Sequence, residues 1–264
     1  MKTMIALSLL TAAGLLAQPP GPPPGRGFGP GRGFGGPGGP ERDINHPVTG
    51  APYSAVETVT ETQILADGNT IQHTRTTNVA RDSQGRFRSE VTETRRGPAA
   101  NGQTGSTFTR VTITDPVSRS VRELDPQSKT VHEMAVHGPP AGAGRGPRPS
   151  PNRQNAANSD PNLKTESLGS QVVNGETATG TRITRTIPAG SEGNAKPIQF
   201  VRETWYSADL KVPVLVKVTD PRRGTTVTQL TNISHTEPDA SLFQAPSDYT
   251  VRTGPGRGPR GNRN

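Results

Sequence analysis

The sequence predicts a mainly β protein: a curved antiparallel meander sheet or half-barrel with at most short helical turns. Apolar and β-branched residues alternate with polar ones over short segments, and turn signals such as Asp67-Gly68 and Asn174-Gly175 separate these segments. No segment after residue 17 carries a helical apolar pattern longer than about two turns. Short strands joined by tight turns pair most simply with their sequence neighbours, so the predicted sheet is an antiparallel meander.

The expected strands fall into two groups along the chain. The first group is predicted at residues 53–65, 69–80, 86–95, 106–114, 117–124 and 129–136. The second group is predicted at residues 164–173, 176–187, 198–206, 212–218 and 225–233. Residues 238–249 predict a helical turn, capped by Asp239 or Ser241, that is followed by an extended segment packing back on the sheet.

The hairpin over residues 197–224 is predicted to supply the densest part of the core. It contains the only Trp of the chain, Trp205, followed by Tyr206. Its second strand places alternate residues on one face of the sheet: Val212, Val214, Val216 and Val218. The polar turn at residues 207–209 and the Asp220-Pro221 turn bound this strand.

Composition limits how much of the chain can fold. The 264 residues include 31 Gly and 27 Pro, and only 28% are hydrophobic, which is typical of one modest domain with disordered segments. The predicted organisation is a signal peptide (1–17), a disordered Gly/Pro-rich arm (18–45), one β domain (46–250) with a disordered insertion (138–162), and a disordered basic tail (251–264). The insertion could divide two domains, but one sheet is preferred because six Thr-rich strands alone bury little apolar surface.

The N-terminus resembles a secretory signal. Lys2 precedes a short apolar run, and cleavage between Ala17 and Gln18 would release a mature chain into the periplasm or the exterior. The apolar run is too short to span a membrane as a helix, which needs about 20 residues. We therefore expect an exported protein without a membrane-spanning segment.

The formal net charge of +8 is concentrated in the segments expected to be disordered. Residues 24–29 and 30–35 repeat the hexapeptide Pro-Gly-Arg-Gly-Phe-Gly, and Gly-Arg-Gly recurs at residues 144–146 and 256–258. Such arms are typical either of polyanion binding or of solvated linkers. Export argues against nucleic acid as the partner, so loose attraction to anionic envelope polymers is the functional alternative.

No motif for catalysis, cofactor binding or metal binding is found. The chain has no Cys, which excludes disulfides and thiolate chemistry. His132 and His137 imitate a zinc-protease motif with the wrong spacing, and on a strand they point to opposite faces. A nucleophile elbow and a phosphate-binding loop are also missing. We expect no enzyme, with a hydrolase as the least favoured alternative.

Two groups of side chains are candidates for binding. Arg222 and Arg223 in the turn after the central hairpin could contact an anionic group. A ligand or core platform is predicted from the aromatic and apolar residues Phe200, Trp205, Tyr206, Leu215, Phe243 and Tyr249.

Three segments together resemble a known group of proteins. They are residues 166–175 (ESLGSQVVNG) with the strand that follows, residues 203–213 (ETWYSADLKVP) and residues 243–249 (FQAPSDY). This pattern resembles the closing half of uncharacterised exported bacterial proteins that are distantly similar to the LolA/LolB/RseB-like superfamily of outer-membrane lipoprotein sorting. The resemblance implies a strongly curved antiparallel sheet that wraps helices and often encloses an acyl-chain cavity.

The sequence therefore favours a non-catalytic exported protein. The leading hypothesis is that it binds an apolar or envelope-derived ligand or a protein partner. The alternative is a structural, polyanion-associating envelope protein that acts through its Arg-Gly-rich tails.

Overall fold

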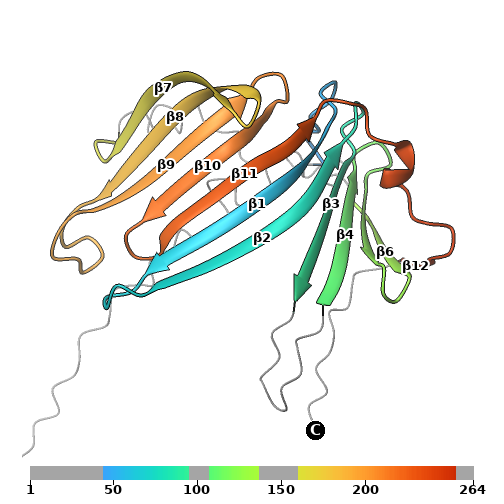
Figure 1. Ribbon diagram of the computed structural model, residues 1–264, viewed down its shortest axis with the longest axis horizontal. Coiled ribbons are helices and arrows are strands. Elements are labelled where there is room, and N and C mark those ends of the chain that lie inside the picture. Colours follow the sequence, from blue (N-terminus) through green and yellow to red (C-terminus); the bar gives the residue numbers. More distant parts are fainter. Residues whose placement is uncertain (1–43, 95–106, 137–159, 254–264) are drawn as a thin grey trace, which may run out of the picture. The chain divides into compact units, whose positions relative to one another are not determined.

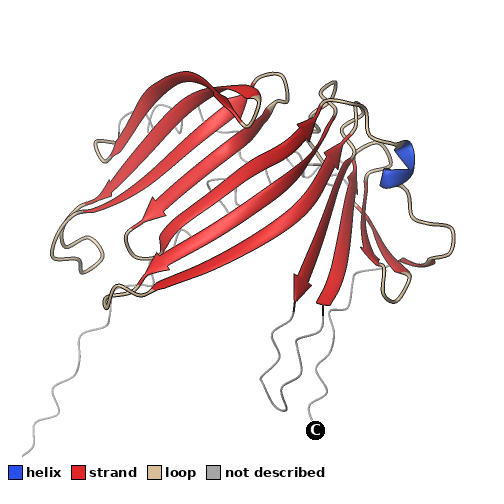
Figure 2. Ribbon diagram, in the orientation of Figure 1, coloured by secondary structure: helices blue, strands red, loops and turns tan. Residues whose placement is uncertain are grey.

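A computed structural model describes residues 44–94, 107–136 and 160–253. The elements are β1 (Tyr53–Ile64), β2 (Thr70–Arg81), β3 (Phe87–Thr94), β4 (Thr107–Asp115), β5 (Ser120–Asp125), β6 (Thr130–Ala135), β7 (Leu163–Val173), β8 (Glu176–Ile187), β9 (Ile198–Ser207), β10 (Val212–Asp220), β11 (Gly224–Ser234), the 3-10 turn η2 (Ala240–Phe243) and β12 (Thr250–Thr253). Figure 2 shows strands nearly throughout and η2 as the one helical element of the described residues.

All twelve strands form one open, curved sheet (Figure 1). Its order is β12-β6-β5-β4-β3-β2-β1-β11-β10-β9-β8-β7. Every neighbouring pair is antiparallel except β12 and β6, which are parallel. The predicted curved meander is confirmed, and the two groups of strands belong to one sheet.

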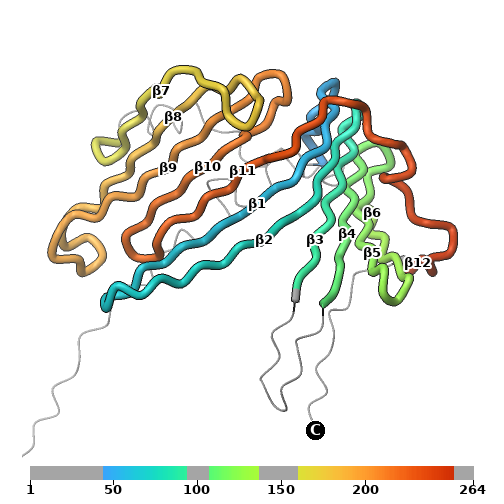
Figure 3. The backbone as a smooth tube through the Cα atoms, in the orientation of Figure 1, coloured from blue at the N-terminus to red at the C-terminus, as the bar shows by residue number. Residues whose placement is uncertain are grey.

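The tight turns explain why the strand boundaries agree with the sequence pattern. Asn174 and Gly175 adopt φ values of 51° and 91°, the left-handed conformation that a two-residue hairpin turn needs. The predicted boundaries of β8 are confirmed at both ends. Figure 3 shows the backbone turning sharply between successive strands of both groups.

Most strand boundaries lie within two residues of the prediction, and two differences have an identifiable physical cause. The strand expected from residue 117 begins only at Ser120, because the Asp115 carboxylate accepts hydrogen bonds from the backbone N–H groups of Val117 (2.9 Å) and Ser118 (3.0 Å) and holds them in a turn. The tail expected to be disordered from residue 251 is ordered as far as Thr253, because β12 pairs with β6. The predicted arm and insertion are each ordered at one end: Ile44 is buried, and the Asn162 N–H donates to the Asp160 carboxylate at 2.9 Å. The signal segment and residues 18–43, 138–159 and 254–264 lie outside the described residues.

The core has two clusters of buried side chains. The larger cluster joins both halves of the chain and contains Tyr53, Ala55, Val79, Phe87, Val173, Ala178, Leu210, Val212, Val214 and Leu230. The central hairpin contributes Leu210, Val212 and Val214 to it. The prediction that Val216 and Val218 share this face is wrong, because a bulge between Pro213 and Leu215 turns them to the face opposite Val212. The second cluster contains Ala80, Val111, Ile113, Leu124, Val131 and Phe243.

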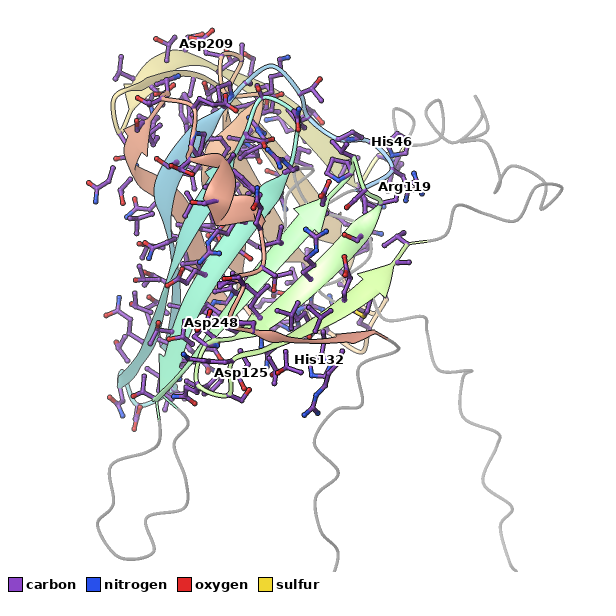
Figure 4. The ribbon with its side chains drawn as sticks, turned by 90° about the vertical axis from the view of Figure 1, so that its right-hand side faces the viewer. His46, Arg119, Asp125, His132, Asp209 and Asp248 are labelled. Carbon is purple, nitrogen blue, oxygen red and sulfur yellow. The ribbon has the colours of Figure 1, made fainter. Side chains whose placement is uncertain are left out.

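The segment after β11 covers the second cluster. Asp239 caps η2 by accepting a hydrogen bond from the Ser241 N–H (2.8 Å), and Phe243 is 1% exposed. The Arg86 guanidinium lies 5.2 Å from the centre of the Phe243 ring. Further along this segment, Asp248 forms an exposed ion pair with Lys129 at 2.8 Å. Figure 4 labels Asp248 beside Asp125. The predicted turn and returning segment are confirmed.

We predict that Phe243→Ala lowers the free energy of unfolding by about 3–5 kcal/mol, because it leaves a cavity in the second cluster. Leu242→Ala is the matched control, since Leu242 is 37% exposed, and it should change stability by less than about 1 kcal/mol. Urea denaturation measures both variants. Equal effects would contradict the role of Phe243 as the anchor of the segment.

Gly180 lies against the Trp205 ring with no room for a side chain. A Cβ atom there would lie 2.7 Å from the Trp205 ring and 2.8 Å from Leu168 Cβ. Gly180→Ala should therefore lower the free energy of unfolding by about 1–3 kcal/mol, because the indole has to move. Thr179→Ala, at the exposed neighbouring position, is the control, and thermal melting followed by Trp fluorescence is the measurement. A Gly180→Ala protein as stable as the control would contradict this packing.

Candidate functional site

A groove of about 450 Å³ lies on one face of β7, β8, β9 and β10, the four strands at the upper left of Figure 1. It is lined by Lys164, Glu166, Arg182, Thr184, Gln199, Val201, Glu203, Lys217 and Thr219. Eight of these nine side chains are polar or charged. An acyl chain would gain little from such walls, so the groove suits a polar ligand.

The strand register assembles the charged side chains into a row. Glu166 pairs with Arg182, Arg182 with Glu203, and Glu203 with Lys217, so all four project from the same face. A second row beside it contains Lys164, Thr184, Val201 and Thr219. Charges from four consecutive strands thus meet through the register of their pairing.

The groove contains two ion pairs and one further cation. Lys164 contacts Glu166 at 2.9 Å, and Arg182 contacts Glu203 at 2.7 Å. The hydrogen bond from Lys164 lowers the pKa of Glu166, which therefore stays ionised at neutral pH. Lys217 is exposed and makes no ion pair with any described residue. The groove has a formal charge of +1, carried by Lys217.

The predicted platform residues do not gather at one place. Trp205 and Leu215 are paired across β9 and β10 and pack against the larger core cluster, whereas Phe243 and Tyr249 belong to the second cluster. Phe200 pairs with Arg185 on the sheet face opposite to Trp205, and Tyr206 is 42% exposed. Trp205 and Leu215 lie on the same face as the charged row, in the adjacent line of paired residues.

The predicted anion contact at Arg222 is already occupied by carboxylates. Its guanidinium donates to both oxygens of Asp220 at 3.0 Å and to Glu192 at 2.7 Å. These hydrogen bonds, above all those from the Arg222 side chain, hold the pKa of Asp220 below its ordinary value. Arg223 is exposed in the same turn. The structure therefore assigns Arg222 to holding the turn between β10 and β11.

One cluster contains the residue types of a hydrolase triad in a different order. The Ser207 hydroxyl donates to Glu176 at 3.3 Å, and His235 Nε2 lies 2.6 Å from the other Glu176 oxygen. A triad needs the imidazole between the hydroxyl and the carboxylate, but here the carboxylate lies between them. Ser207 is also completely buried. The cluster connects the ends of β8, β9 and β11 and provides no activated nucleophile.

The described ranges contain neither a metal-binding cluster nor a helix that could span a membrane. These residues contain no group of three or more His, Asp or Glu side chains that could hold a metal ion. His132 is on β6, and His137 lies outside the described residues. Within the part of the chain that is described, no helix has the length and apolarity needed to cross a membrane.

Sequence reasoning missed the charged groove. Its signal was present, because charged residues occur at alternate positions of the strands, as at Lys164 and Glu166. The same pattern is typical of any solvated strand face. Only the register shows that the charges of four strands form one row.

No family model and no curated protein matches the sequence. Among solved structures, similarity is found to the Pseudomonas aeruginosa MucA/MucB complex, with 13% identity and a TM-score of 0.39 over 81% of this chain and 59% of that chain. A LolA superfamily protein from Nitrosomonas europaea has 9% identity and a TM-score of 0.31 over 77% and 94% of the two chains. The Mycobacterium tuberculosis lipoprotein LppX has 13% identity and a TM-score of 0.29 over 75% of this chain and 93% of that chain.

This chain spans less than two thirds of the MucB chains that it matches. The predicted LolA-like resemblance is confirmed as a distant likeness of fold. It carries no statement about function. The wrapped helices that the resemblance implies are not found among the described residues, whose single helical element is η2.

The Asp220–Arg222 contact predicts a pH dependence of stability. The pKa of Asp220 is lower in the folded state than in the unfolded state. The ionised carboxylate therefore adds its full contribution to folding stability above the ordinary Asp pKa, and this contribution is lost as pH falls from about 5 through the lowered pKa. Asp220→Asn should lower the free energy of unfolding by about 1–3 kcal/mol at pH 7 and by much less near pH 3. Urea denaturation across pH 3–7 measures this difference. A pH-independent effect of the substitution would contradict the ion-pair interpretation.

Proposed function

We propose that this protein is a non-catalytic binding protein of the extracytoplasmic space. In this proposal, the groove on β7–β10 holds an extended, anionic segment of a protein partner or envelope polymer. The observation that carries the proposal is the row of charges in the groove, in which Lys217 is an exposed cation beyond the two ion pairs. The signal-like segment at residues 1–17 supports the compartment.

The chemistry of the groove favours a polar partner over the apolar ligand that the sequence also allowed. Val201 is the one apolar side chain among the lining residues, so little affinity could come from burying a hydrocarbon there. Arg182 and Glu203 are already satisfied by each other, which leaves Lys217 to attract a carboxylate or phosphate. Affinity based on one exposed cation is modest and falls with salt.

The test uses hexaglutamate as the probe and the mature full-length chain. Calorimetry at low ionic strength should detect binding that Lys217→Glu weakens by about tenfold, because an attractive contact becomes repulsive. Lys211→Glu is the matched control: it makes the same charge change at an exposed lysine in the β9–β10 turn, outside the groove. Equal loss in both variants would mean that only net charge matters and would contradict the groove.

Native mass spectrometry of the protein purified gently from its own host provides an independent check. An acidic peptide or polymer adduct that Lys217→Glu removes would support the proposal. A lipid or another apolar adduct would contradict it and would restore the apolar-ligand hypothesis.

The alternative function through Arg-Gly-rich tails remains a separate proposal, because those tails lie outside the described residues. Deletion of residues 18–40 and 251–264 should abolish association with anionic cell-wall polymers at low salt if the tails act in this way. Unchanged association would contradict it.

A further inference from the structure

Among the described residues, the sheet has an internal edge between β2 and β3 for which no pairing is found. β2 pairs with β1 along its whole length, from Tyr53 opposite Arg81 to Ile64 opposite Thr70. With β3 it pairs over five residues only, from Thr77 opposite Val91 to Arg81 opposite Phe87. Figure 1 shows β2 and β3 separating beyond these pairs. We call residues 70–76 of β2, with the facing part of β3, the β2–β3 seam.

The edge of β2 along this seam is accessible. All seven residues from 70 to 76 are exposed. Among the described residues, their backbone groups make no hydrogen bonds other than those of the β1 pairing. Within the part of the chain that is described, residues 70–76 therefore present an edge about 23 Å long whose outward backbone donors and acceptors have no partner, which is a template for another strand.

One face of the seam has hydroxyl groups on both sides. Thr74 and Thr76 project from β2, and Thr92 projects from β3 to the same face. The flanking strands show how these hydroxyls pair, because Thr60 and Thr74 lie 3.5 Å apart and Thr92 and Thr109 lie 3.0 Å apart. A strand in the seam that carries Thr or Ser on this face would continue the same cross-strand hydrogen bonds.

The other face requires a neutral group that can both donate and accept. Arg75 Nη1 and Glu93 Oε1 face each other across the seam at 4.0 Å, and both side chains are more than 40% exposed. Such an exposed ion pair contributes little stability. A Gln or Asn side chain between them can accept from the guanidinium and donate to the carboxylate, whereas a charged side chain meets one like charge.

The shape of the seam also restricts its occupant. The five pairs between β2 and β3 close one end, so a single extended segment fits better than the edge of a folded sheet. A second copy of this chain, pairing its β2 antiparallel about His73, would place His73 against His73 and would bring no acid to Arg75. Self-pairing is therefore the poorer match.

We propose that the β2–β3 seam binds an extended segment of a partner protein that carries hydroxyl side chains on one face and amide side chains on the other. The segment adds a strand to β2, and its backbone satisfies the unpaired groups of residues 70–76. This site is separate from the groove on β7–β10, which uses side-chain charge instead of a backbone edge.

Hydrogen–deuterium exchange on the mature full chain tests the proposal, with the capped peptide Thr-Gln-Thr-Gln-Thr-Val-Thr as the probe. At saturating peptide, exchange over residues 70–76 should slow by at least about fivefold. Residues 163–173 of β7, an outer edge of the same sheet, should be unaffected. The control peptide Thr-Lys-Thr-Lys-Thr-Val-Thr should bind about tenfold more weakly, because each Lys is placed beside Arg75 or His73.

A variant pair locates the contact. Arg75→Glu removes the guanidinium donor and places two carboxylates beside the amide, so the protection by the probe peptide should fall by at least about fivefold. Arg223→Glu makes the same charge change in an exposed turn and should leave the protection unchanged. Melting temperatures of both variants should remain close to that of the parent, which separates loss of binding from loss of folding.

Three results would overturn the proposal. Equal protection of residues 163–173 would indicate non-specific addition to any free edge. If exchange of residues 70–76 slows with increasing protein concentration in the absence of peptide, a second copy of the chain occupies the seam. Slow exchange of residues 70–76 in the free monomer that becomes fast when residues 95–106 are replaced by a short Gly linker would indicate that this segment of the chain itself occupies the seam. Failure of hexaglutamate binding at the groove would leave this test unaffected.

Discussion

The pairing of β1 with β11 holds the two halves of the sheet together. It joins the first strand of the domain to one about 170 residues later, with register pairs from Ser54–Ser234 to Thr62–Thr225. Without it, the chain would consist of two smaller meanders, each with an additional open edge and little apolar surface to bury. With it, Tyr53 and Ala55 enter the same cluster as Val212 and Leu230. Loop closure over this separation is entropically costly, so the cluster and the pairing stabilise each other.

Arg81 makes a second connection between the halves. It is completely buried and stacks 4.8 Å from the centre of the Tyr53 ring. Its guanidinium donates to the Ala51 carbonyl, at 2.6 and 3.0 Å, and to the Leu210 carbonyl. A buried cation requires such acceptors, so the segment before β1 and the turn between β9 and β10 must both take defined positions beside β2. The contact thus contributes to a unique arrangement of the sheet at the end where its larger core lies.

The distribution of polar groups is what supports the proposed binding role. The two core clusters contain mostly Ala, Val and Leu, with Tyr53, Phe87 and Phe243 as their large buried side chains. The cluster of Ser207, Glu176 and His235 connects three elements instead of activating a nucleophile. The two proposed binding surfaces are the charged row on β7–β10 and the edge of β2 that no described strand pairs with. Both are suited to extended polar segments, which bind through hydrogen bonds and charge more than through apolar area.

Local alternation and turn chemistry were enough to predict the β class, the approximate strand boundaries, the turn at Asn174 and Gly175, and the returning segment with Phe243. The sequence alone could not place Trp205 and Phe243 in different clusters or assemble Lys164, Arg182, Glu203 and Lys217 into one groove. It also gave no sign that β2 separates from β3 after five pairs. These features depend on strand order and register, and many registers satisfy the same alternation when both faces carry Thr. Tertiary structure decided them, because only long-range pairing and core packing select one register.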